Sequence, residues 1–190
     1  YTAAGGFFAA SATDFVQSII MTVAIVFVLV FSTISAGGVD AVVENAKALP
    51  GYLSLTASYI EDIGKSEPYN LLHIITTLSW GLGYFGMPHI LLRFMAIEDE
   101  KKLKLSRRVA SVWVVIAMAM AVLIGIVGRA LSNTGLVDQL HGNDTETIIV
   151  RVAHLLSTYG AFPAIMAGLI LAGILASTMS TADSQLLAAA

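Results

Sequence analysis

The sequence predicts an all-α, polytopic membrane protein, and three observations lead to this fold class. Of the 190 residues, 57% are hydrophobic and only 12% are charged, about half the roughly 25% that is typical of soluble domains. The mean hydropathy is +0.82. Uncharged apolar runs, long enough to cross a hydrocarbon core of about 30 Å, recur along the chain with polar connectors between them.

Composition also excludes several classes of function. The net charge is only −3, and no basic tract is interleaved with aromatic residues, so we expect no nucleic-acid partner. The absence of cysteine excludes a disulfide framework and thiolate chemistry. We find no nucleophile–base pair at a recognisable spacing and no HExxH motif, so we do not expect an enzyme. The chain starts at Tyr1 and ends in an apolar segment, which favours a piece of a longer membrane protein, with residues 1–190 in one transmembrane domain.

The first predicted span covers residues 15–36, which contain no charge. The small, glycine-containing stretch 1–13 before it is typical of the end of an earlier span or of a tight connection. Asp14 stands between them and has two interpretations. It is either an interfacial residue at the start of a helix or a carboxylate on an ion path, since ionisable groups at membrane depth are usually functional.

The second predicted span, residues 71–97, follows a polar connector whose residues 41–49 have the spacing of a surface helix. Its middle reads WGLGYFGMPH and contains three glycines and Pro88. These residues favour an interrupted helix, and such a break is tolerated only where protein or a water-filled cavity meets the freed backbone groups. Trp80, Tyr84 and Phe85 at the break indicate either bundle packing or a solute site, and the coincidence with the break favours a site.

The third predicted span, residues 109–131, follows the most charged tract of the chain, which we expect as a loop over residues 98–108. With Arg93, whose side chain we expect to reach the inner surface, this region holds six of the ten Lys and Arg residues. The positive-inside rule places it in the cytoplasm. A polar loop and an interfacial helix over residues 148–159 come next.

The fourth predicted span covers residues 163–182 and carries hydroxyl side chains three and four residues apart, which share one helix face. They are Ser177, Ser180, Thr181 and Ser184. Two interpretations stay open from the sequence alone. Small polar residues let membrane helices pack closely and hydrogen-bond, or the hydroxyls and a freed carbonyl form an oxygen site for a hard alkali cation.

The string SWGLGYFGMPHILLRFMA (Ser79 to Ala96) resembles the corresponding span of the sodium/solute symporter family, most closely the sodium/proline symporters of the PutP type. The stretches YTAAGGFFAASATDFVQ (Tyr1 to Gln17) and ILASTMSTADSQLL (Ile174 to Leu187) and the pair Arg107-Arg108 agree with that family in order and spacing.

The resemblance implies a fold of the LeuT type, with two inverted five-helix repeats, of which this chain holds a part. It implies a secondary active transporter of the bacterial inner membrane that couples inward Na+ movement to uptake of a small solute, most closely L-proline. By motif, Ser180 and Thr181 would offer hydroxyls to Na+ and Ser177 its backbone carbonyl. Asp14 would lie on the sodium path. The residues that would line the substrate site are Trp80, Tyr84 and Pro88.

Two alternatives stay open within this resemblance. The same fold also serves as the sensory domain of membrane-bound histidine kinases, and a kinase domain downstream in the full gene would favour that function. A sodium symporter for another small zwitterion or a carboxylate would share the same motifs.

Overall fold

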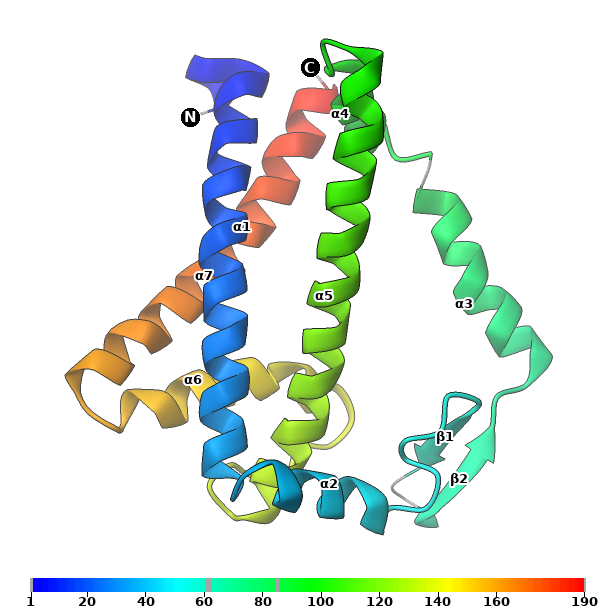
Figure 1. Cartoon of the computed structure of the whole chain (residues 1–190), viewed down its shortest axis with the longest axis vertical. Coiled ribbons are helices and arrows are strands. Elements are labelled where there is room, and N and C mark those ends of the chain that lie inside the picture. The colour runs from blue at the N-terminus through cyan, green and yellow to red at the C-terminus, as the bar shows by residue number, and fades with distance from the viewer. Residues whose placement is uncertain (1, 61–62, 85, 190) are drawn as a thin grey trace.

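The computed structural model describes residues 2–60, 63–84 and 86–189. Three long helices dominate it: α1 (Thr2–Ser35), α5 (Glu100–Asn133) and α7 (Ala161–Ala189). Helix α1 packs against both α5 and α7 (Figure 1). Within the described part of the chain, these three helices are long and apolar enough to cross a membrane. The chain is therefore an α-helical membrane protein of the polytopic kind.

Helix α1 is longer than expected at its start. Residues 2–13, predicted as a connection or the end of an earlier span, are helical and continuous with the rest of α1 except at Gly6. Gly6 has φ 56° and ψ −147°, a conformation that glycine adopts without a steric cost and that kinks the helix. At the other end, Gly37 and Gly38 both have positive φ and end the helix, as their position after the apolar run predicts.

Short elements gather at one end of the long helices (Figure 1). They are α2 (Val39–Ala48), the 3₁₀ helix η2 (Gly142–Thr147), α6 (Ile148–Ser157) and an antiparallel hairpin of β1 (Ala57–Ile60) and β2 (Lys65–Pro68). The two surface helices were predicted from their spacing, but the hairpin was not. Arg129 of α5 lies over the rings of Tyr52 and Tyr59, at 5.9 and 5.7 Å from their centroids, and so holds the hairpin region against α5.

The stretch 71–97 forms two helices, α3 (Leu71–Tyr84) and α4 (Pro88–Met95). The interruption predicted from the glycines and Pro88 is present, with Pro88 in the first turn of α4 where its missing N–H costs nothing. Phe85 lies outside the described residues. Together α3 and α4 lead from the hairpin end of the molecule to the opposite end (Figure 1), and neither contains a buried residue.

The charged tract expected as a loop is largely helical, because α5 begins at Glu100. Its start has a clear local cause. The Asp99 side chain accepts a hydrogen bond from the Lys101 backbone N–H at 2.9 Å and caps the helix, and Glu100 stands in the positive first turn.

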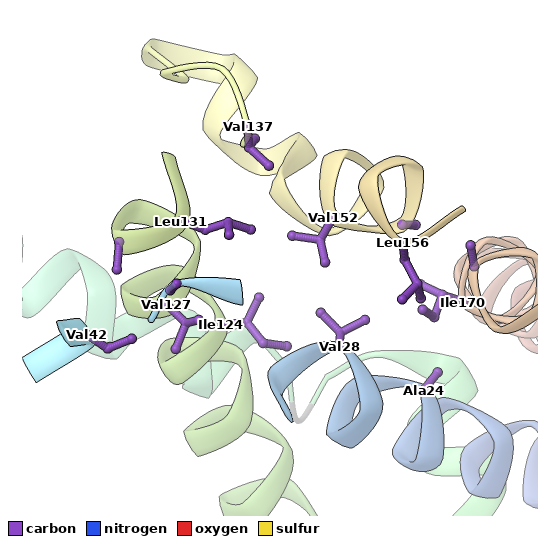
Figure 2. Packing of buried hydrophobic residues seen from close by; sticks show 14 residues of the cluster. Ala24, Val28, Val42, Ile124, Val127, Leu131, Val137, Val152, Leu156 and Ile170 are labelled. Carbon is purple, nitrogen blue, oxygen red and sulfur yellow. The ribbon is translucent and has the colours of Figure 1, made fainter. Parts of the chain in front are cut away.

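The hydrophobic core lies toward the end of the molecule that carries α2 and α6. Val28 of α1, Leu131 of α5, and Val152 and Leu156 of α6 are at most 1% exposed and face one another (Figure 2). Gly128 lets α5 approach this layer closely, since a Cβ there would stand 2.5 Å from Cγ1 of Ile148. The opposite halves of α5 and α7 contribute few residues to this core, and the candidate site lies between them.

Candidate functional site

A cavity of about 840 Å³ lies between α4, α5 and α7, in the half of the molecule opposite to the core. Side chains from the start of α5, including Ser106, Arg107 and Ser111, form one wall. Tyr84 at the end of α3 and His89 of α4 also line it. A space of this size holds a small organic solute together with water.

The hydroxyl face of α7 forms another wall of the cavity. All four residues predicted to share that face line it: Ser177, Ser180, Thr181 and Ser184. The Thr181 hydroxyl donates to the backbone carbonyl of Ser177 at 3.2 Å. Two oxygens of the predicted cation site therefore lie within one hydrogen bond of each other.

Asp14 of α1 is joined to this hydroxyl face. Its Oδ1 accepts a hydrogen bond from the Ser180 hydroxyl, and its Oδ2 accepts one from Arg93 Nη2 of α4 at 2.7 Å. The Asp14 side chain is 21% exposed. Asp14 is thus neither fully solvated nor alone, and three helices that are distant in sequence meet at its carboxylate.

Arg93 was expected to reach the inner surface, which stays a prediction; its side chain is 52% exposed and pairs with Asp14. Nη2 of Arg93 donates both to Asp14 and to the Ser184 hydroxyl, the latter at 2.9 Å. The sequence did contain a signal for the ion pair of Asp14 and Arg93. Asp14 and Arg93 are opposite charges close to the same predicted membrane side of two spans, and ionisable groups in spans usually pair.

The three predicted substrate residues are not gathered in the described structure. Tyr84 lines the cavity, whereas Pro88 borders a separate depression beside Met87 and Gln185. Trp80 stands on α3 with 77% of its surface exposed and is not part of the cavity wall. Of the seven predicted site residues, Tyr84, Ser177, Ser180 and Thr181 share the cavity, and Asp14 adjoins it through Ser180.

The donor set limits which ions could bind. Among the described residues, no three His, Cys, Asp or Glu side chains cluster as a metal site. Hydroxyl and carbonyl oxygens with one carboxylate are ligands for a hard cation, and the Arg93 charge already offsets that of Asp14. Such a set favours a singly charged alkali ion over a transition metal, which prefers imidazole or thiolate ligands.

Comparison with known proteins identifies the family of the chain. The model of the sodium:solute symporter family matches residues 1–190. The chain is 36% identical over 187 residues to a sodium/proline symporter 2 of Staphylococcus saprophyticus, covering 98% of this chain and 33% of that protein. It is 37% identical over 188 residues to the high-affinity proline transporter PutP of Bacillus subtilis, covering 98% and 36% respectively.

A sodium/proline symporter of Escherichia coli is 36% identical over 192 residues, with 98% of this chain and 35% of that protein covered. No solved structure matches the chain with statistical significance. The chain spans about a third of the length of the curated relatives it matches. The family match over the whole chain, together with three helices long and apolar enough to cross a membrane, establishes that this chain belongs to the sodium:solute symporter family.

Proposed function

We propose that the protein containing this chain is a secondary active transporter that couples inward movement of Na+ to uptake of L-proline. The observation that carries the proposal is that one cavity of about 840 Å³ is lined by Tyr84 and by Ser177, Ser180 and Thr181. The names of the relatives, which are sodium/proline symporters and a proline transporter, support both the ion and the solute.

In this proposal the hydroxyls of Ser180 and Thr181 and the carbonyl of Ser177 are ligands of Na+, and Asp14 lies on its path. The closeness of the Thr181 hydroxyl to the Ser177 carbonyl supports the ligand set. The bond from Ser180 to Asp14 supports the path, because an ion leaving the hydroxyls meets the carboxylate next.

Trp80, Tyr84 and Pro88 are the proposed substrate residues. They flank the break between α3 and α4, where freed backbone groups can serve a solute. Trp80 lies outside the cavity wall in the described arrangement. Its role therefore requires that α3 pack closer to α7 when the solute is bound.

We infer four membrane spans, over residues 15–36, 71–97, 109–131 and 163–182, with the basic tract near residues 98–108 in the cytoplasm. Helices α3 and α4 together form the second span, interrupted at the solute site. The architecture would be part of a LeuT-type bundle of two inverted five-helix repeats in the cell membrane of a bacterium. Helices α3 and α4 run from one end of the molecule to the other (Figure 1), which supports a second crossing of the membrane by residues 71–97.

Coupling follows from simple thermodynamics. Na+ bound at α7 would favour the arrangement that completes the solute site and so raise the affinity for the solute. Bound solute must then raise the affinity for Na+ by the same factor. The membrane potential adds about 2.3 kcal/mol per charge per 100 mV to inward Na+ movement. Rocking of helices around the site would then expose both to the cytoplasm.

The test is uptake of labelled L-proline by the full-length protein in proteoliposomes, with and without an inward sodium gradient. We expect sodium-driven accumulation that Trp80→Ala reduces by about ten-fold, since an aromatic contact that becomes buried when α3 packs closer to α7 contributes roughly 1 kcal/mol or more. Trp113→Ala is the matched control. Trp113 lies on α5 outside the cavity wall, with its indole N–H 3.4 Å from the Thr22 hydroxyl.

The outcomes separate the parts of the proposal. Sodium-driven uptake of a different zwitterion or of a carboxylate, without proline uptake, would keep the transporter and overturn the substrate. Binding of solute without any transport would instead favour the sensory domain of a histidine kinase.

A further inference from the structure

Arg93 connects three helices through one nitrogen atom. Its Nη2 donates to Asp14 Oδ2 of α1 at 2.7 Å and to the Ser184 hydroxyl of α7 at 2.9 Å. Ser184 is buried, with 7% of its surface exposed, whereas the Arg93 side chain is 52% exposed. The guanidinium thus enters the site from the open side of the cavity.

Both oxygens of the Asp14 carboxylate are occupied in this arrangement. Arg93 holds Oδ2, and the Ser180 hydroxyl donates its hydrogen to Oδ1. The guanidinium therefore occupies the position beside Asp14 that an arriving cation would take.

We propose that Arg93 is a built-in counter-cation of Asp14, and that Na+ reaches Asp14 only by displacing it. This inference rests on the proposed sodium transport, and it adds a residue that sets the affinity for the ion. Arginine stays protonated at every physiological pH, so its charge cannot leave the site by deprotonation. The Asp14 carboxylate carries a single negative charge, and Arg93 already lies 2.7 Å from its Oδ2, so Arg93 and Na+ compete for the same group.

The competition has a consequence for α4. Among the described residues, the two bonds from Arg93 are the side-chain hydrogen bonds that join α4 to α1 and α7. No residue of α4 is buried, so packing holds it weakly. Displacement of Arg93 by Na+ would release α4, which directly follows the break of the solute site and begins with Pro88.

The test is equilibrium binding of ²²Na+ to the purified full-length protein, which needs no solute and no transport. The apparent affinity for Na+ is the intrinsic affinity multiplied by the fraction of protein that is competent to bind. Removing the competing guanidinium should raise that fraction and therefore the apparent affinity. We expect Arg93→Gln to lower the half-saturating sodium concentration by about three-fold or more. Arg93→Lys keeps the positive charge, so its half-saturating sodium concentration should stay closer to that of the wild type. Arg108→Gln removes a positive charge from the same basic region but outside the cavity wall, and it serves as the control for loss of charge.

A double-mutant cycle with Asp14→Asn separates competition from a structural role. In the Asp14→Asn background, Arg93→Gln should no longer raise sodium affinity, because the group for which both cations compete is gone. If Arg93→Gln does not fold, Ser184→Ala loosens the guanidinium without touching Asp14 and should shift sodium affinity in the same direction.

The outcomes distinguish this inference from the proposed function. No ²²Na+ binding by the wild type would overturn sodium transport itself. Sodium binding that Arg93→Gln and Ser184→Ala leave unchanged or weaken would overturn the competition alone. The competition would also be overturned if Arg93→Gln changed sodium affinity by the same factor with and without the Asp14 carboxylate.

Discussion

At the scale of single residues, two threonines of α7 allow the proposed ion site to be tested against helix packing. The hydroxyls of Thr178 and Thr181 each donate to the carbonyl four residues earlier at 3.2 Å. Both side chains belong to exposed residues. Thr181 lines the large cavity, whereas Thr178 lines a separate apolar crevice of about 260 Å³ between α1, α5, α6 and α7. The two threonines therefore make the same local hydrogen bond but line different cavities.

We expect Thr181→Ala to raise the half-saturating sodium concentration for uptake by about ten-fold, because a polar contact to a charged group contributes roughly 1.5–3 kcal/mol. Thr178→Ala should leave sodium activation close to the wild type. Expression of both variants is checked by immunoblot of membranes. Equal sodium activation in the two variants would remove Thr181 from the ion site.

Tyr52 offers a prediction in the polar connector, outside the membrane-spanning helices. Burial raises the pKa of Tyr52 above its ordinary value of 10.0, and the nearby Arg129 guanidinium opposes this rise. Above about pH 10, Tyr52 of the unfolded chain ionises while that of the folded chain stays protonated, so the folded state binds more protons and loses stability as pH rises. Below that pH, Tyr52 contributes no pH dependence.

The measurement is the thermal unfolding midpoint of wild type and Tyr52→Phe from about pH 8 to pH 11. Any advantage of the wild type over Tyr52→Phe should shrink above pH 10, because phenylalanine cannot ionise. A difference between the two proteins that stays constant over this range would contradict the assignment.

Much of the site could be read from residue types and spacing. Hydroxyls at positions 177, 180, 181 and 184 must share a helix face, and they do line one cavity. The bond from Arg93 to Asp14 depends on how α4 packs against α1, which no local spacing encodes. That pair was therefore missed, although opposite charges in two spans pointed to it.

At the scale of elements, the contact between α5 and α6 depends on one glycine. A Cβ at Gly128 would lie 2.5 Å from Cγ1 and 3.0 Å from Cδ1 of Ile148, so Gly128→Ala forces the start of α6 to move. Overpacking of this kind costs roughly 1–3 kcal/mol. Gly125, one turn earlier on α5, would place a Cβ with nothing within 4 Å and serves as the control.

We expect Gly128→Ala to lower the thermal midpoint of the purified protein and Gly125→Ala to leave it unchanged or raise it, since alanine favours a helix more than glycine. Thermal unfolding of the full-length protein in detergent measures both. A lower midpoint for Gly125→Ala than for Gly128→Ala would show that α5 and α6 do not meet in this way.

The helices themselves follow from the sequence, whereas their connections do so only in part. Apolar runs predict α1, α5 and α7, and helical spacing predicts α2 and α6. The hairpin of β1 and β2 was missed because KSEP and ASYI are short and lack alternating hydrophobicity. The start of α5 was missed because a dense charged tract is also compatible with a helix when Asp99 caps it.

At the scale of the whole molecule, the hydrophobic core and the large cavity lie at opposite ends. The core joins α1, α5, α6 and α7 (Figure 2) near the end that carries the hairpin (Figure 1), and the cavity opens between α4, α5 and α7 near the other end. The described residues of α4 are not buried, whereas the core packs tightly at the other end. This division would suit the proposed transporter, which must expose one site to two sides of a membrane.

The orientation of the two ends relative to the membrane can be tested by cysteine labelling. The 190 residues contain no cysteine, so each introduced cysteine is the single labelling site in this part of the protein. Single cysteines at three exposed positions report the two ends: Glu67 in β2, Lys104 in α5 and Asn143 in η2. They are introduced into the full-length protein, with any cysteines elsewhere replaced, and labelled in intact cells with a membrane-impermeant maleimide. Since the basic tract is expected in the cytoplasm, Glu67→Cys and Asn143→Cys should react from outside, and Lys104→Cys should react only after permeabilisation. Labelling of Glu67→Cys and Lys104→Cys from one side would show that residues 71–97 do not cross the membrane, and the broken second span would have to be abandoned.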